Sequence, residues 1–221
     1  MSQSRDVIGQ QELHYFGMVS ASVSHELKNV LAILNENAGL LQDFAAMAEQ
    51  GQPLDPVRIR RLAATMLGQI NRGDEIIKRM NRFAHSADDN HATVELGQLM
   101  TMVVELFGRT ATNRGITVEV KAAVEAVNIY TDTFALETLL GGLLYRITEA
   151  APDANPLTLE LDPQVDVTRI KLAGLAEHAD IINSIQESDE IKALLAALNG
   201  SAYFNQQNGE LIITLNGAIV T

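Results

Sequence analysis

The sequence of 221 residues predicts an α+β protein in which a long antiparallel helical hairpin is followed by an α/β sandwich. Residues 13–48 and 57–84 contain no proline, and their apolar side chains recur at helical spacing. Beyond residue 88, short apolar runs typical of strands alternate with helical stretches, and the charge becomes strongly acidic. We therefore expect a flexible N-terminus, a hairpin and a sandwich, at residues 1–10, 11–87 and 88–221.

The first helix is predicted from a stripe of apolar residues that fall within about 60° of one another on a helical wheel. These residues are Phe16, Val23, Leu27, Val30, Leu34 and Leu41. The stripe stops before residues 50–53, Gln-Gly-Gln-Pro, whose glycine and proline are typical of a turn.

The second helix begins with Asp55 as its N-cap and Pro56 in its first turn. Its predicted apolar face comprises Ile59, Leu62, Met66, Ile70, Ile77, Met80 and Phe83. Gly68 and Gly73 each weaken this helix by about 1 kcal/mol relative to alanine, so packing must hold it. An isolated hairpin of this kind leaves apolar surface uncovered, so we expect a homodimer that completes a four-helix bundle.

The formal net charge of −12 argues against a nucleic-acid partner, because binding nucleic acid requires a basic surface. Residues 11–87 carry 8 acidic and 8 basic side chains, whereas residues 88–221 carry 19 acidic and 7 basic ones, a net of −12. This change supports a division into two parts. Cysteine is absent, and no run of about eighteen apolar residues or secretory signal is present. We expect a cytoplasmic protein with no membrane association.

The C-terminal part reads as a mixed sheet with helices covering one of its faces. Asp132 is a candidate N-cap for a helix that runs to residue 150, and Asn208-Gly209 is typical of a tight hairpin turn. Strands are expected at residues 94–95, 116–121, 127–130, 157–161, 168–172, 201–205 and 211–215, and further helices at residues 98–111 and 176–198.

His25 lies about 190° from the centre of the first apolar stripe, so we expect its imidazole to face solvent. Its neighbours on that side are Ala21, Ser22, Lys28, Asn29 and Ala32. Small residues around an exposed imidazole leave room for another protein to approach. An isolated exposed histidine on a helix is more often simply solvated, so the assignment depends on the residues around it.

Residues 16–41, FGMVSASVSHELKNVLAILNENAGLL, resemble the phosphoacceptor box of bacterial histidine kinases. The run from His25 to Asn29, His-Glu-Leu-Lys-Asn, matches the core of that box, although Val30 stands where the family usually has proline. The resemblance implies that His25 accepts a phosphoryl group. A carboxylate beside a nucleophilic imidazole can orient it and accept a proton, which is the role expected of Glu26. Asn29, one turn on, can reach the phosphoryl group or orient a water.

The C-terminal part resembles the ATP-binding domain of the same family, but in a degenerate form. Residues 131–146 are similar to the helix that contacts nucleotide, and residues 191–203 to the last helix and its turn. Arg146 stands where the resemblance places the magnesium-binding asparagine, and Gly142 replaces its companion. The Asp-x-Gly-x-Gly signature is absent at residues 172–176, and no glycine-rich phosphate loop precedes Ile191. We expect no bound nucleotide or metal, and no ATP-dependent kinase activity.

The resemblance therefore points to a dimeric histidine phosphotransferase of a two-component phosphorelay. His25 would shuttle a phosphoryl group between aspartates of response-regulator receiver domains, with Mg²⁺ supplied by the receiver. Receiver contacts are expected at Ala21, Ser22, Lys28 and Ala32. Residues 57–84 carry 7 basic and 2 acidic side chains, a net of +5, which suits an acidic receiver but also fits a plain solvated helix face.

Two alternatives remain open. The protein could be an inactive pseudokinase that sequesters a response regulator or pairs with an intact kinase. It could also be a response-regulator phosphatase in which Asn29 positions water. The other histidines (His14, His85, His91 and His178) show no spacing that suggests a metal site with a third donor.

Overall fold

The computed structural model describes residues 2–88, 91–121, 125–154, 156–164 and 167–216. It divides the chain into two compact units. The hairpin unit is Ser20–Arg82, and the sandwich unit combines Met1–Val19 with Phe83–Thr221. The predicted division had placed residues 11–19 and 83–87 with the hairpin.

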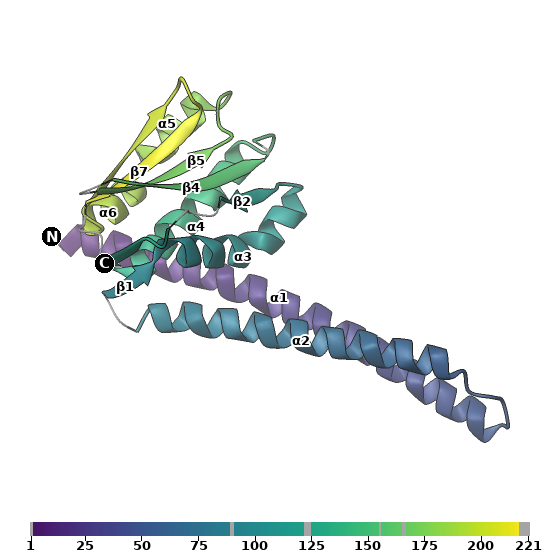
Figure 1. The fold of residues 1–221 in the computed structure, drawn as a ribbon. Helices are drawn as coiled ribbons and strands as arrows, with labels where there is room; N and C mark the ends of the chain where they lie inside the picture. Colours follow the sequence, from purple (N-terminus) through teal and green to yellow (C-terminus); the bar gives the residue numbers. More distant parts are fainter. Residues whose placement is uncertain (1, 89–90, 122–124, 155, 165–166, 217–221) are drawn as a thin grey trace. The chain divides into compact units, whose positions relative to one another are not determined.

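Two long helices carry the N-terminal part of the chain (Figure 1). Helix α1 covers Ser2–Glu49 and helix α2 covers Pro56–Ser86. Residues 1–10, which we expected to be flexible, are thus helical from Ser2 onward. The predicted N-cap is confirmed, because the Val57 amide donates to Asp55 Oδ1 at 2.8 Å. Gly51 adopts a positive φ of 82° in the turn between the helices.

Within the hairpin unit, Val30 of α1 lies against Gly73 of α2. A Cβ atom at Gly73 would lie 3.4 Å from Val30 Cγ1, which is an ordinary van der Waals contact. Both residues are buried, and so are Val23, Asn37 and Ile76. Position 73 therefore lies at the buried contact between the helices, where an alanine would also fit. Val30, in the place of the family's proline, lies within an uninterrupted helix.

The predicted apolar face of α2 is only partly buried in the single chain. Ile70 and Ile77 are 52% and 49% exposed, whereas Ile76 is 1% exposed. The positions that face α1 alternate in steps of three and four residues, which places Ile77 one residue outside this series. Leu31 on α1 and Leu67 on α2 are also exposed. This uncovered apolar surface is the surface that the predicted homodimer would bury.

The sandwich unit is built on a five-stranded sheet with the order β2-β4-β5-β7-β6. Its β2–β4 pair is parallel, and the other pairs are antiparallel. A separate antiparallel pair joins β1 (Ala92–Glu95) to β3 (Asn128–Thr131). The strands of the larger sheet are β2 (Val118–Val120), β4 (Leu157–Pro163), β5 (Val167–Ala173), β6 (Gly200–Asn205) and β7 (Glu210–Asn216).

Helices cover one face of this sheet, as the sequence predicted (Figure 1). They are α3 (Leu96–Arg114), α4 (Thr133–Ala150), α5 (Ala179–Gln186) and α6 (Asp189–Ala197). Alternate strand residues, among them Leu157, Leu159 and Ile170, are buried in the core against the helices. The protein is therefore an α+β protein with a helical hairpin and a mixed α/β sandwich.

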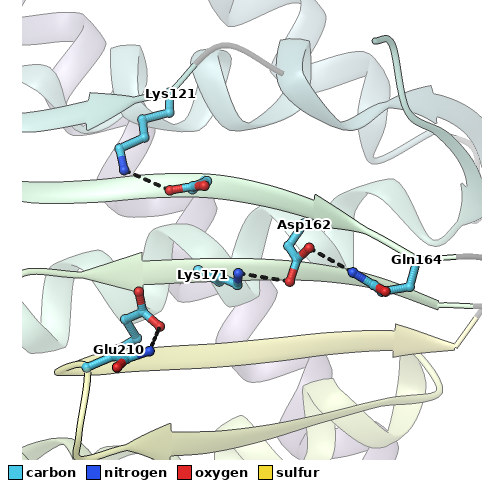
Figure 2. A network of polar contacts seen from close by, with 7 residues as sticks. Lys121, Asp162, Gln164, Lys171 and Glu210 are labelled. Atoms are coloured by element: carbon cyan, nitrogen blue, oxygen red, sulfur yellow. Dashed lines mark hydrogen bonds and ion pairs between the residues drawn. The ribbon is translucent and has the colours of Figure 1, made fainter. Parts of the chain in front are cut away.

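The opposite face of the sheet is polar (Figure 2). Lys121 pairs with Glu160 at 2.8 Å, and Lys171 pairs with Asp162 at the same distance. The hydrogen bond from Lys171 lowers the pKa of Asp162 below its ordinary value. Since these ion pairs remain partly exposed, they mark a solvated face, and each contributes at most about 1 kcal/mol.

Local signals read from the sequence fix several element ends in the sandwich unit. The Asp132 carboxylate accepts from the Ala135 amide at 3.0 Å and caps α4, as predicted. Gly209 has a φ of 63° in the β6–β7 turn, and a Cβ atom there would overlap the backbone of Ala176. The predicted turn at Asn208-Gly209 is thus confirmed, and its glycine is also required by close packing.

Candidate functional site

His25 lies on α1 within the hairpin unit, and its side chain is exposed, as the helical wheel predicts. Ala21, Lys28, Asn29 and Ala32 are exposed as well. Residues 21, 25, 28 and 32 are separated by four, three and four positions, so they share one face of the helix. This face, which we call the His25 face, combines a nucleophilic ring with two alanines that offer no steric barrier.

Ser22 does not belong to the exposed part of this face. Its side chain is only partly accessible, and its Oγ atom is buried without a hydrogen-bond partner in the described residues. The contact between Ser22 and a receiver stays a prediction, and its hydroxyl is less accessible than the other predicted contact residues. The remaining predicted contact residues, Ala21, Lys28 and Ala32, are accessible.

Glu26 lies in different surroundings from His25. Its side chain is 16% exposed, and its Oε2 atom lies 4.0 Å from Nη2 of Arg79 on α2. Among the described residues, no hydrogen bond joins this carboxylate to the His25 ring. Adjacent residues on a helix point in directions about 100° apart, which explains the separation. A role for Glu26 in orienting the imidazole therefore requires a change of its side-chain rotamer.

A second set of candidate residues lies in the sandwich unit, where Gly142 and Arg146 of α4 line a cavity of about 270 Å³. A Cβ atom at Gly142 would meet nothing within 4 Å. Arg146 Nη2 donates to Gln11 Oε1 at 3.4 Å, and Nη1 lies 3.7 Å from Glu190 Oε2. The other lining residues are Gln11, His14, Tyr15, Met18, Thr138, Tyr145 and Glu149.

Sequence reasoning missed the part that α1 plays in the sandwich unit. Tyr15 is 5% exposed, and its ring occupies the space that a methyl group at Gly141 would need. The first turns of α1 thus pack directly on the face of α4 that carries Gly141 and Gly142. The consecutive glycines in an otherwise apolar helix were the available signal, because glycines in a helix often mark close packing.

Neither a metal site nor a membrane span is found in the part of the chain that the structure describes. No group of three or more His, Cys, Asp or Glu side chains there could hold a metal ion. No described helix is both long and apolar enough to cross a bilayer.

No protein-family model matches the chain, and no curated protein matches it. Solved structures of histidine kinases do match it. The histidine kinase AdeS of Acinetobacter baumannii is 15% identical, with 85% of this chain and 98% of that chain covered and a TM-score of 0.43. The ATP-binding domain of PrrB from Mycobacterium tuberculosis is 11% identical, with 60% and 100% covered and a TM-score of 0.47.

A third match is the histidine kinase ThkA in complex with the response regulator protein TrrA. It is 15% identical, with 95% of this chain and 64% of that chain covered and a TM-score of 0.48. Likeness at this level of identity assigns no role to any residue of this chain.

Proposed function

We propose that this protein transfers phosphoryl groups through His25 between aspartates of response-regulator receiver domains. The observation that carries the proposal is the His25 face: the histidine of a phosphoacceptor-like sequence is exposed on a continuous helix, with Ala21 and Ala32 on either side. A receiver domain can therefore bring its phosphoaspartate to the imidazole without a clash.

The proposed reaction needs no reactant other than this protein and a phosphorylated receiver. A ring nitrogen of His25 uses its lone pair to attack phosphorus, a nitrogen–phosphorus bond forms, and the phosphorus–oxygen bond of the acyl phosphate breaks. The aspartate leaves as a carboxylate. The second transfer reverses these steps with the aspartate of another receiver. Mg²⁺ held by the receiver neutralises the charge on the phosphoryl oxygens, so this chain supplies no metal ligand.

Glu26 and Asn29 assist in this proposal. When the imidazole becomes phosphorylated, the proton on its other nitrogen becomes more acidic, and a nearby carboxylate stabilises or accepts it. Glu26 is adjacent to His25 in the sequence. To reach the imidazole, its carboxylate moves away from Arg79. Asn29 is exposed four residues after His25, where its amide can donate to a phosphoryl oxygen.

We further propose that the protein does not obtain phosphate from ATP. The cavity beside Gly142 and Arg146 has a volume of about 270 Å³, which is below the range of roughly 300–1,000 Å³ typical of small-molecule sites. Arg146 also lies near the carboxylate of Glu190. A guanidinium group cannot coordinate a cation. These features support a phosphoryl donor other than a bound nucleotide.

The surface of α2 supports an acidic partner. Arg60, Arg61, Arg72 and Arg82 are exposed along this helix. Such basic residues increase the rate at which a negatively charged protein associates, and the effect weakens with salt. We propose that receiver domains dock on the hairpin unit, and that a homodimer presents two such hairpins.

A sequestering role without turnover is the second candidate, and the position of Glu26 favours it. In the structure its carboxylate is paired with Arg79 rather than with the imidazole. A phosphatase role is the third candidate, since the exposed amide of Asn29 can orient a water near a phosphoryl group.

The deciding experiment uses a receiver domain that carries a radiolabelled phosphoryl group. Incubation with this protein should move label to His25, and addition of a second, unlabelled receiver should remove it. His25→Ala should abolish labelling, while His91→Ala, which changes another exposed histidine, should not. Binding of the receiver without labelling would support sequestration. Release of inorganic phosphate without a labelled intermediate would support the phosphatase.

A further inference from the structure

A buried carboxyl group in the sandwich unit has no part in the proposed phosphotransfer. Glu137 lies on α4 within the buried run of residues 135–141 and is 1% exposed. Its Oε2 atom is 2.6 Å from Oγ of Ser86, in the last turn of α2. An ionised carboxylate at such a depth is strongly unfavourable unless a cation or several donors compensate it.

The number of protons available for hydrogen bonds around Ser86 indicates the protonation state of Glu137. Ser86 Oγ lies 2.6 Å from Glu137 Oε2 and 2.7 Å from the carbonyl oxygen of Phe83. A hydroxyl group has one proton, so it cannot donate to both oxygens at full strength. If Glu137 is protonated, it donates to Ser86 Oγ, and the Ser86 hydroxyl donates to Phe83. Only this state satisfies both short contacts.

The titratable groups that act on Glu137 also favour its protonated form. Burial is the largest influence, and the negative charge of Asp132 adds to it, while the hydrogen bond with Ser86 opposes them. Together they raise the pKa of Glu137 from 4.5 to about 8. On α1, the buried phenol of Tyr15 has a raised pKa, caused first by burial and then by Glu137. The pKa of Glu12, also on α1, is raised first by burial and then by the charge of Asp132.

The same turn of α2 is held by aromatic packing within the sandwich unit. The ring of Phe83, which is 0% exposed, lies 5.6 Å from the rings of Tyr15, Phe16 and Phe134. At the end of α2, exposed His85 pairs with Asp88 at 3.0 Å. The hydrogen bonds among Glu137, Ser86 and Phe83 thus connect α4 to the last turn of α2, and the packing around them is apolar.

We propose that Glu137 is a proton-dependent latch, which fastens the last turn of α2 (Phe83–Ser86) to α4 when protonated and releases it when ionised. Ionisation removes the proton that Glu137 shares with Ser86, so two acceptors compete for one hydroxyl. The buried charge then favours an opened turn that admits water. Because the compact units divide between Arg82 and Phe83, the latch acts where the hairpin helix enters the sandwich unit.

Glu137→Gln tests the latch because an amide imitates the protonated acid. Its Nε2 donates to Ser86 Oγ, the Ser86 hydroxyl still donates to Phe83, and the side chain no longer titrates. Glu149→Gln is the matched control, since Glu149 is an exposed glutamate on the same helix. Ser86→Ala removes the middle of the chain and should loosen the turn at every pH.

The measurement is amide hydrogen exchange at residues 84–88 between pH 6 and pH 9.5, with each rate divided by the intrinsic rate at that pH. Protection in the wild type and in Glu149→Gln should fall by up to about tenfold per pH unit as the pH rises toward 8, because the opened turn has lost the proton that the closed turn keeps, and it should level off above that pH. Protection in Glu137→Gln should stay constant. The same loss of protection in Glu137→Gln would overturn the proposal.

A second measurement tests the proposal without the glutamine variant, in case that variant folds poorly. The carboxyl carbon of Glu137, followed by NMR in the wild-type protein, should titrate well above the exposed glutamates. A midpoint near that of Glu149 would also overturn the latch.

Discussion

Single residues in this protein owe their chemistry to the neighbours that folding gives them. His25 and Glu26 are adjacent, yet the imidazole faces solvent while the carboxylate lies beside Arg79. Leu136 and Glu137 are also adjacent, and both are buried. The first arrangement leaves an imidazole accessible from solvent, whereas the second raises the pKa of a carboxyl group.

Glu26→Ala should slow phosphoryl transfer to His25 on the order of a hundredfold, because it removes the group that stabilises and accepts the imidazole proton. Arg79→Met is the companion variant, since it removes the partner of Glu26 but leaves the carboxylate in place. It should transfer at least as fast as the wild type. Rapid-quench kinetics with a phosphorylated receiver would measure both. An unchanged rate in Glu26→Ala would exclude this role.

The stability of the sandwich unit should depend on pH through Glu137. Its pKa is about 8 in the folded protein and 4.5 as the ordinary value. Between these values the folded state holds a proton that the unfolded state has lost, so folding is favoured at low pH. The stabilisation is complete below about pH 4.5 and is lost as the pH rises through 8, with a slope of at most about 1.4 kcal/mol per pH unit.

Urea unfolding of the wild type and Glu137→Gln at pH 5, 6, 7 and 8 would measure this dependence. The free energy of unfolding of the wild type should decrease relative to the variant over this series. A difference that does not change with pH would contradict the raised pKa.

Among the elements, the contact between α1 and α4 depends on Gly141, whereas the next residue, Gly142, has different surroundings. A methyl group at Gly141 would overlap the ring of Tyr15, whereas one at Gly142 would enter open space. The two positions therefore offer a matched test of whether the first turns of α1 pack on the sandwich unit.

Gly141→Ala should destabilise the protein by about 1–3 kcal/mol, because the buried Tyr15 ring must move. Gly142→Ala should stabilise it by up to about 1 kcal/mol, because alanine is the better helix former. Chemical denaturation of both variants would measure these changes. Equal effects at the two positions would show that α1 does not pack on α4 in solution.

At the scale of the whole molecule, the hairpin unit leaves Leu31, Leu67, Ile70 and Ile77 exposed in the single chain. A helical hairpin buries only part of its apolar surface on itself. We expect a second copy to cover this surface in a symmetric dimer, because identical stripes are complementary about a two-fold axis.

Ile77→Glu should dissociate the expected dimer while leaving each hairpin folded, since Ile77 does not face α1. Asn71→Glu places the same charge at another exposed position of α2 and is the control. Light scattering at micromolar concentration should give a monomer for the first variant and a dimer for the second. A wild-type monomer would exclude the dimer altogether.

Features that depend on neighbouring residues could be predicted from the amino-acid sequence. Helical periodicity predicted the hairpin and the exposure of His25, the carboxylates of Asp55 and Asp132 predicted two helix starts, and Asn208-Gly209 predicted a turn. Each of these follows from backbone geometry over a few residues. The roles of Ala21, His25, Lys28 and Asn29 were likewise proposed from a local pattern and await experiment.

Contacts between groups that are far apart in the chain could be read only from the folded structure. It placed Ile76 rather than Ile77 against α1, Arg79 beside Glu26, and Tyr15 over Gly141. It also joined Ser86 to Glu137, 51 residues apart. A periodic pattern predicts which face of a helix is apolar. It does not predict which element packs against that face, because this depends on how two complete elements pack. Glu137 shows the consequence, since its burial raises the pKa of an ordinary glutamate from 4.5 to about 8.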